Sequence, residues 1–385
     1  MENCSAPSTR QRPSLAEVAA SFLKLGTIAF GGPAAHIAMM EEEFVGRRGW
    51  LTREEFLDRL ASANLIPGPS STELAIFIGY GQRGWPGLIV AGCCFIIPAA
   101  ILVTLFAAAY VRYGSLPRMA GMLYAIKPVV IAVILQALAK LARTAVPTKF
   151  LAAVAVVAFG LNFFGVNPLL ALAISGVLAA LGSARTQGRV IAGVNLAMPK
   201  ALLAVGVAVV VIPVTLSRLF LSFLKIGSIV FGSGYVLLAF LRTEFVTKLH
   251  WLTEKQLIDA VAVGQFTPGP VFTTATFIGY IVAGIPGAIV STIGIFLPGF
   301  LLVAVSGPII PKLRQSPIFS AALDGVVAGS LALMAVVCWQ LSRAAVVDWF
   351  TLAAFAVALL ALIRFRINSA WLIMAAGLLG FFVKG

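Results

Sequence analysis

Two lysines lie inside apolar segments at equivalent places in the two halves of the chain. Lys24 stands in the run Phe-Leu-Lys-Leu-Gly, and Lys225 stands in the run Phe-Leu-Lys-Ile-Gly. A charge in such a segment costs about 3 kcal/mol on membrane-insertion scales, so it has a partner or a ligand. Because an ammonium group suits a hydrated polyanion as a point charge, the pair favours binding of a dianion. An ion pair with Glu43, Asp58 or their copies, and snorkelling of the long side chain, are the alternatives.

Helix-breaking residues recur at two matched places in each half. The first break is Gly31, Gly32 and Pro33, repeated as Gly232, Ser233 and Gly234; the second is Pro67, Gly68 and Pro69, repeated as Pro268, Gly269 and Pro270. Proline lacks an N–H and glycine tolerates unusual backbone angles, so each break frees backbone groups within the bilayer. Freed groups persist only where they line a buried or watered cavity. The half-helix after each break exposes N–H groups at its positive end, which forms a site for an anion.

Hydroxyl residues follow the second break in both halves: Ser70, Ser71 and Thr72 in one, and Thr273 and Thr274 in the other. We expect the four half-helix starts to converge near the membrane midplane. With the two lysines and these hydroxyls they form the predicted substrate site. Simple kinks in packed helices are the alternative, because proline and glycine are common in membrane helices.

The candidates for proton coupling are acidic and imidazole groups near these segments: Glu43, Glu244, Asp58, Asp259, Glu73 and His36. Burial and a neighbouring cation shift the pKa of a carboxyl in opposite directions, so carboxylates beside lysines can carry protons. They also suit loop and capping positions. Glu73 matches a threonine in the second half and His36 matches Leu237, and such asymmetry is where a directional proton path would enter. A hydrogen-bonded interface histidine is the alternative for His36.

The elements that position these residues are duplicated. Phe22 recurs as Phe223, 201 residues further along, and the Glu-Phe-Val and Trp-Leu-Thr stretches recur at the same offset. Repeated helix breakers in an apolar chain indicate a membrane site built from two related halves. The predicted domains are a cytoplasmic tail over residues 1–13, transmembrane repeat 1 over 14–184, a linker with one extra transmembrane helix over 185–217, and transmembrane repeat 2 over 218–385.

The composition requires a lipid environment. The 385 residues are 60% hydrophobic and 11% charged, whereas soluble domains are about 25% charged. Since a helical span needs about 20 apolar residues, we predict an all-α polytopic membrane protein with about 11–13 membrane segments. The net charge of +14 comes from Lys and Arg scattered in turns between apolar runs. The positive-inside bias explains that placement better than nucleic-acid binding does.

Loop charge predicts that the two repeats have opposite orientations. The turn over residues 165–167 is uncharged, whereas its counterpart carries Arg364 and Arg366. Because positive loops stay cytoplasmic, this change of bias indicates inverted-topology repeats with discontinuous or re-entrant helices. The loop that contains Arg112 and Arg118 does not follow the pattern.

No catalytic constellation is present in the sequence, which predicts a protein that is not an enzyme. A glycine-rich phosphate loop ending in Lys-Ser/Thr is absent, and this argues against direct drive by ATP. The two histidines are far apart and the four cysteines have no ligand spacing. We therefore predict no metal site and no cofactor.

The motifs resemble those of the chromate ion transporter family in its long, two-domain form. They are Phe-Gly-Gly-Pro-Ala-Ala-His at 30–36, the Glu-Phe-Val to Trp-Leu-Thr stretch at 43–52, Pro-Gly-Pro at 67–69 and Ile-Gly-Tyr at 78–80. The resemblance covers both halves and implies a bacterial inner-membrane protein that exports chromate. The family's motif residues correspond to Gly31, Gly32, Pro33, Pro67, Gly68, Pro69 and Gly79, with Pro268, Gly269 and Pro270 in the second repeat. Gly234 replaces the proline of the first break and Leu237 replaces His36, so that break is expected to be looser in repeat 2.

We therefore predict a multi-pass secondary active transporter that exports chromate across the bacterial inner membrane by alternating access, coupled to protons or to the membrane potential. Residue chemistry supports an oxyanion, and the resemblance specifies chromium. A transporter of sulfate or another oxyanion, and a passive anion channel, are the alternatives. The expected partners are a tetrahedral oxyanion such as chromate or sulfate and membrane lipid, without nucleic acid. A homodimer is left open.

Overall fold

The computed structural model describes residues 12–30, 32–114, 116–186, 213–230, 236–306, 316–365, 367 and 369–383. Four predicted site residues, Gly31, Gly232, Ser233 and Gly234, lie outside the described residues, as do most of the predicted linker and most of the N-terminal tail. The described part of the chain folds into helices, which confirms the all-α class.

The elements occur in the same order in both halves. Repeat 1 contains α1 (Leu15–Ile28), α2 (Gly32–Glu41), the π-helical segment η1 (Glu42–Arg47), α3 (Arg53–Ala63), α4 (Ser70–Tyr113), α5 (Pro117–Ala145), α6 (Lys149–Phe163) and α7 (Pro168–Thr186). Repeat 2 contains α8 (Leu216–Ile229), α9 (Leu237–Leu241), the π-helical segment η3 (Arg242–Lys248), α10 (Glu254–Phe266), the short 3-10 segment η4 (Val271–Thr273), α11 (Thr274–Ser306), α13 (Pro317–Ala345), α14 (Trp349–Arg364) and α15 (Ser369–Val383).

The repeated Trp-Leu-Thr motif sets the start of α3 and α10. Thr52 accepts a hydrogen bond from the Glu55 N–H, and the Glu55 side chain accepts one from the Thr52 N–H. Thr253 and Gln256 form the same reciprocal cap on α10. Two exposed N–H groups are satisfied at each start, so the threonine of the motif fixes where each helix begins.

The long helices α4 and α11 fold back on themselves. The 44 residues of α4 would extend about 66 Å if straight, twice the thickness of the hydrocarbon core. Instead Gly84 leaves the helical conformation with φ 60°, and Gly284 does the same in α11 with φ 63°. A Cβ on Gly79 would overlap the carbonyl oxygen of Gly87, which lies beyond the turn. In a straight helix these two residues would be far apart. Gly279 and Gly287 of α11 make the same contact, so α4 and α11 each consist of two antiparallel helical segments.

A second antiparallel pair precedes each of these turns. The Arg59 side chain of α3 lies against Gly81 of α4, and the Gln82 amide donates to the carbonyl oxygen of Trp50 at 3.2 Å. The chain therefore runs along α3, turns, and returns along the start of α4. Repeat 2 does the same, with Gly264 of α10 against Thr274 of α11. We call these pairs hairpin 1 (residues 53–82) and hairpin 2 (residues 254–282), and their turns tip 1 (residues 67–69) and tip 2 (residues 268–270).

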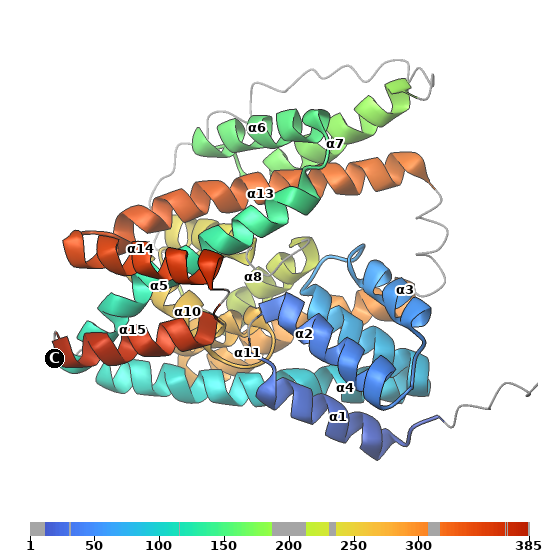
Figure 1. Ribbon diagram of the computed structural model, residues 1–385, viewed down its shortest axis with the longest axis horizontal. Helices are drawn as coiled ribbons and strands as arrows, with labels where there is room; N and C mark the ends of the chain where they lie inside the picture. The colour runs from blue at the N-terminus through green and yellow to red at the C-terminus, as the bar shows by residue number, and fades with distance from the viewer. Residues whose placement is uncertain are drawn as a thin grey trace, which may run out of the picture.

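The two repeats are interleaved. The helices α6 and α7 of repeat 1 pack on α13 of repeat 2, and α14 and α15 of repeat 2 pack on α5 of repeat 1 (Figure 1). Small residues permit the close approach: Gly325 of α13 lies against the carbonyl oxygen of Ser175 in α7, and Gly380 of α15 lies against that of Gly121 in α5. Neither repeat is a separate body.

The aromatic residues of the repeated motif form one cluster in each repeat, with buried phenylalanines and a half-buried tryptophan: Phe22, Phe44 and Trp50, and then Phe223, Phe245 and Trp251. Neighbouring rings in these clusters lie 4.8–6.1 Å apart between centroids. This is the distance range of favourable aromatic pairs. Much of the sequence repeat therefore encodes packing of the first helix of each repeat against its π-helical segment.

Gly227 allows α8 to touch α11, because a Cβ at this position would overlap the carbonyl oxygen of Ile295. We expect Gly227→Ala to destabilise the protein by about 1–3 kcal/mol, as overpacking does. A lower melting temperature of the purified protein in detergent would report this. The matched control is Gly160→Ala in α6, where a Cβ meets nothing within 4 Å. Equal melting temperatures for the two variants would contradict the close α8–α11 contact.

Four helices among the described residues are long and apolar enough to cross a membrane: Ser70–Tyr113, Arg118–Ala145, Val271–Val305 and Pro317–Ala345. Shorter apolar helices accompany them: Lys149–Phe163, Pro168–Ser183, Trp349–Arg364 and Ser369–Phe382. Two of the long helices are the folded-back α4 and α11. Length and composition thus agree with a multi-pass membrane protein.

Candidate functional site

Each hairpin tip contacts the opposite repeat, and we call the region of these two contacts the crossing. The Gly68 N–H of tip 1 donates to the carbonyl oxygen of Val230, directly after α8, at 2.7 Å. The Gly269 N–H of tip 2 donates to the carbonyl oxygen of Ala29, directly after α1, at 3.0 Å. The end of a broken helix leaves carbonyl groups without a helical partner, and here each repeat supplies a donor to the other. Tip 1 therefore lies at the end of α8 in repeat 2, and tip 2 lies at the end of α1 in repeat 1.

Glycine is required at both tips by the backbone and by space. The φ angles are 138° at Gly68 and 84° at Gly269, in the region that side chains disfavour. A Cβ on Gly269 would also lie 2.7 Å from the Cβ of Ala99 and 3.3 Å from the carbonyl oxygen of Gly26. Tip 2 is thus inserted between α1 and the second half of α4.

His36 joins the same crossing. Its Nε2 lies 3.0 Å from the carbonyl oxygen of Ala29 and its Nδ1 lies 3.3 Å from the Ser71 Oγ. Because a carbonyl only accepts, Nε2 carries the proton. The Ala29 oxygen therefore accepts from both His36 and Gly269. This geometry matches the hydrogen-bonded interface histidine, and Leu237 makes it impossible in repeat 2.

The half-helix starts carry the expected hydroxyls, and all of them are buried: Ser70, Ser71, Thr72, Thr273 and Thr274. In repeat 2 the Thr273 hydroxyl donates to the carbonyl oxygen of Pro270 and the Thr274 hydroxyl to that of Val271, each at 2.8 Å. These two hydroxyls are engaged as donors, so backbone N–H groups are the donors left at this start. Pro33 lies in the first turn of α2, where its missing N–H is least costly.

Glu73 lies in the first turn of α4 and is fully buried. Neither of its carboxyl oxygens has a hydrogen-bond partner among the described residues. The carboxyl group lies beside Gly68 of tip 1 and near Gly299 of α11. It occupies the positive end of a half-helix, where an anion was expected. Burying an isolated ionised carboxylate is very costly, which keeps Glu73 among the candidates for proton coupling.

Lys24 has a carboxylate partner. Its Nζ lies 3.3 Å from the Glu43 Oε2, and the Arg48 Nε donates to the other oxygen at 2.8 Å. The Arg48 hydrogen bond, with the nearby Lys24, holds the pKa of the Glu43 carboxyl below its usual range. The ion pair that the sequence left as an alternative is therefore present in repeat 1. The Lys24 side chain is still 47% exposed, so it lies at the edge of the protein rather than in its interior.

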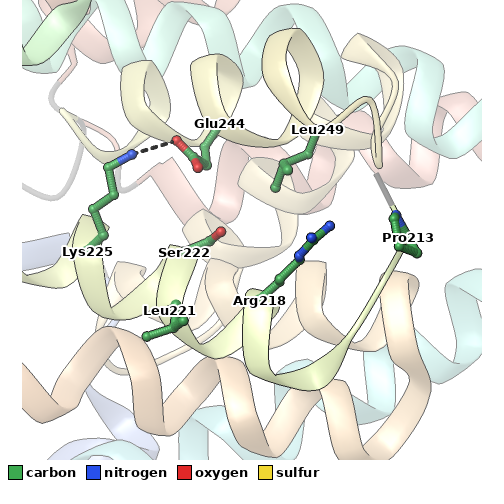
Figure 2. Close-up of a pocket in the computed structure, with 7 residues that line it drawn as sticks. All are labelled: Pro213, Arg218, Leu221, Ser222, Lys225, Glu244 and Leu249. Carbon is green, nitrogen blue, oxygen red and sulfur yellow. Dashed lines mark hydrogen bonds and ion pairs between the residues drawn. The ribbon is translucent and has the colours of Figure 1, made fainter. Parts of the chain in front are cut away.

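Lys225 has the equivalent partner, with 3.1 Å between its Nζ and the Glu244 Oε2. Figure 2 shows this pair at the side of a cleft of about 400 Å³, into which Arg218 projects from α8. The Lys248 Nζ lies 3.8 Å from the same Glu244 oxygen. Two lysines thus share one carboxylate, and because Arg218 and Lys225 line the cleft with a single acid, Glu244, the cleft carries net positive charge.

The cleft is not repeated with the same charge in repeat 1. The position equivalent to Arg218 is Glu17, whose carboxyl caps α1. Sequence reasoning missed Arg218, although a change of sign at an otherwise repeated position was a usable signal.

A second asymmetry concerns the aspartates. Asp58 of α3 is exposed, whereas Asp259 of α10 is fully buried. Asp259 Oδ1 lies 3.3 Å from the Lys127 Nζ of α5, and the Tyr110 hydroxyl of α4 donates to Oδ2 at 3.0 Å. Sequence reasoning missed both partners. Lys127 was detectable as a lone charge within an apolar helix, whereas nothing in the pattern marked Tyr110.

The described residues are helical and form two interleaved copies with long apolar helices. Helix ends of one copy meet the hairpin tips of the other, which is the architecture of a multi-pass membrane transport protein. The chain belongs to the chromate transporter family: the family model Chromate transporter matches residues 16–182 and residues 217–381. Two matched copies confirm the long form, and membership of a transporter family confirms that the protein is not an enzyme.

Relatives with related names match most of the chain. A chromate transport protein of Cupriavidus metallidurans is 35% identical over 324 residues, covering 83% of this chain and 80% of the relative. A probable chromate transport protein of Synechococcus elongatus is 32% identical, covering 84% and 83%. An uncharacterized transporter of Methanocaldococcus jannaschii is 30% identical, covering 84% of each. No solved structure matches the chain significantly.

Proposed function

We propose that this protein is a secondary active transporter that exports chromate across the bacterial inner membrane by alternating access, coupled to protons or to the membrane potential. The family and the printed names of the relatives support chromate as the substrate. The observation that carries the carrier mechanism is the crossing of the tips, in which Gly68 pairs with Val230 and Gly269 pairs with Ala29.

In this proposal the repeats, over residues 14–184 and 218–385, are inverted relative to each other, hairpins 1 and 2 are re-entrant, and the chain makes 11–13 membrane segments. The reciprocal exchange of hydrogen bonds supports a two-fold relation between the repeats. A tip can leave its carbonyl partner without breaking either helix of its hairpin. Movement of one hairpin against the opposite repeat therefore opens one of the two tip contacts while the interleaved helices stay packed, which is what alternating access needs.

The oxyanion is held by the half-helix starts at the crossing. Each start presents backbone N–H groups at a positive helix end, which suits an anion that has lost part of its water. The residues that we assign to this site keep the sequence prediction: Gly31, Gly32, Pro33, Pro67, Gly68, Pro69, Ser70, Ser71 and Thr72 in repeat 1, and Gly232, Ser233, Gly234, Pro268, Gly269, Pro270, Thr273 and Thr274 in repeat 2. Of these, Gly31, Gly232, Ser233 and Gly234 lie outside the described residues. Lys24 and Lys225 draw the anion toward it from the edge of the protein.

Glu73 is the proton carrier that we favour, because it is buried at the crossing without a partner among the described residues. Glu43 and Glu244 are bound to lysines, and Asp58 is exposed. Asp259 and His36 have partners that engage their polar atoms.

Lys225→Ala is expected to raise the chromate concentration for half-maximal flux by about tenfold at low ionic strength, since a positive cleft raises the local concentration of an anion. The effect should shrink with added salt, because the side chain is 41% exposed and screening acts on exposed charges. Initial flux rates at low and high salt measure both. The control is Lys149→Ala, which removes an exposed lysine on α6. A loss of flux that salt does not change would contradict a role in attracting the anion.

Flux measurements in proteoliposomes test the function itself. The purified protein is reconstituted, and labelled chromate is followed under an imposed pH gradient, an imposed membrane potential, or neither. Accumulation above equilibrium under a gradient supports secondary active transport. Equilibration without accumulation under either gradient identifies a passive channel. Inhibition of chromate flux by excess sulfate, together with sulfate accumulation at a higher rate, identifies a general oxyanion transporter.

A further inference from the structure

A buried charge cluster joins the repeats, and of its three members only Asp259 belongs to the sequence repeat. It consists of Lys127 from α5, Tyr110 from α4 and Asp259 from α10, and we call it the Lys127 cluster. The Lys127 Nζ lies 3.3 Å from the Asp259 Oδ1, and the Tyr110 hydroxyl donates to the Asp259 Oδ2 at 3.0 Å. Two members come from repeat 1 and one from repeat 2.

The cluster is far more buried than the other lysine pairs. The Lys127 side chain is 11% exposed and Asp259 is 0% exposed, whereas Lys24 and Lys225 are nearly half exposed. Lys127 also lies within α5, one of the helices long and apolar enough to span a membrane. An ionisable residue in such a segment is by default functional, because burying its charge is expensive.

The equivalent positions of the two repeats do not form a second such cluster. The position equivalent to Lys127 in α13 is Val327, and the aspartate equivalent to Asp259 is the exposed Asp58. The repeats share their caps, aromatic clusters and tips, so this departure is not needed to build the fold. A carrier that binds one anion at a time needs a single strongly attractive site rather than two equal ones.

The cluster is built onto hairpin 2. Asp259 precedes Phe266, at the end of α10, by seven residues, which is two helical turns. The Tyr110 ring lies 5.3 Å from the Phe277 ring of α11, and the Phe106 ring lies 5.8 Å from the Phe266 ring. Hairpin 2 also carries tip 2, so a change in the cluster reaches the crossing through a rigid element.

We propose that Lys127 is a ligand of the transported oxyanion at a second binding position, two helical turns of α10 from the crossing, and that Asp259 is the internal anion that occupies Lys127 while the carrier is empty. A carboxylate oxygen and a chromate oxygen accept the same hydrogen bonds, so the ammonium group and the Tyr110 hydroxyl can pass from one to the other. The incoming dianion displaces Asp259, and this releases hairpin 2 from α5. Lys255, an exposed residue one turn before Asp259 in α10, is a further positive charge that acts on both Lys127 and Asp259. This inference rests on the proposed transport of an oxyanion.

Four variants test it: Lys127→Met, Asp259→Asn, the double variant with both changes, and the control Lys140→Met, an exposed lysine on the same helix α5. Melting temperature in detergent, equilibrium binding of labelled chromate and flux in proteoliposomes are measured for each. We expect Lys127→Met to lower the melting temperature and to abolish binding. The double variant should regain the melting temperature of the wild type, because no buried charge is unpaired, but should bind chromate at least about 50-fold more weakly. Asp259→Asn should bind chromate about tenfold more tightly and turn over more slowly, since the internal competitor is gone.

A double variant that binds chromate and transports it as the wild type does would overturn the inference, because the pair would then be structural. Unchanged or weaker chromate binding by Asp259→Asn would overturn it as well. Neither result would contradict the proposed function, provided that the wild type accumulates chromate. Failure of the wild type to bind or move any oxyanion would instead remove the proposed function.

Discussion

Gly269→Ala is expected to reduce chromate flux by at least about tenfold, the effect of about 1.4 kcal/mol on a barrier. The new Cβ would lie 2.7 Å from the Cβ of Ala99, so tip 2 must withdraw from α1 and α4. Its withdrawal lengthens the hydrogen bond from the Gly269 N–H to the carbonyl oxygen of Ala29. The contact between tip 2 and repeat 1 is then lost.

Gly165→Ala is the matched control, because it separates backbone strain from the loss of the crossing. Its φ of 88° is close to the 84° of Gly269, so both variants bear a similar strain of about 1–2 kcal/mol. A Cβ on Gly165 meets nothing within 4 Å. Flux of labelled chromate per reconstituted molecule is measured for both variants, with melting temperature alongside. Equal losses of flux would show that strain alone explains the effect, and wild-type flux in Gly269→Ala would show that transport does not need the crossing.

Glu73→Gln is expected to abolish accumulation driven by a pH gradient while exchange of chromate for chromate continues. The amide keeps the shape of the side chain but cannot gain or lose a proton near neutral pH. Because the carboxyl is fully buried and has no partner among the described residues, a neutral substitute should not unfold the protein. We expect accumulation under an imposed pH gradient to fall at least about tenfold, with little change in melting temperature.

Glu54→Gln provides the control, since Glu54 is an exposed acid in the first turn of α3. Chromate accumulation under a pH gradient and tracer exchange at equal pH are measured on the same vesicles. If Glu73→Gln still accumulates chromate in response to a pH gradient, Glu73 does not carry the coupled proton. Accumulation that responds to an imposed potential in both variants would then leave the membrane potential as the driving force.

Much of the site could be predicted because helix breaking is a local property. Proline and glycine act on their own backbone, so the interruptions at Pro67 and Pro268 were visible without any tertiary contact. The same holds for the threonine caps of α3 and α10, which need only residues within one turn. The family could also be recognised, since its motifs are runs of neighbouring residues.

The roles of the charged residues were less accessible. Asp58 and Asp259 occupy the same place in the repeat, yet one is exposed and the other is fully buried against Lys127 and Tyr110. Lys24 and Lys225 were expected to attract an anion or to pair with a carboxylate, and each has its glutamate partner. Burial depends on what the rest of the chain packs around a residue, and a repeated motif carries no record of that.

The amino-acid sequence by itself determined the membrane environment, the duplication, the helix interruptions and the family, because composition, periodicity and short motifs are properties of residues close together in the chain. Only the tertiary structure decided that each tip pairs with the opposite repeat, that Glu73 lies buried at the crossing, and that Lys127 meets an aspartate 132 positions away. These contacts arise from interleaving of the helices, and their energies depend on solvent exclusion by the whole fold rather than on any local pattern.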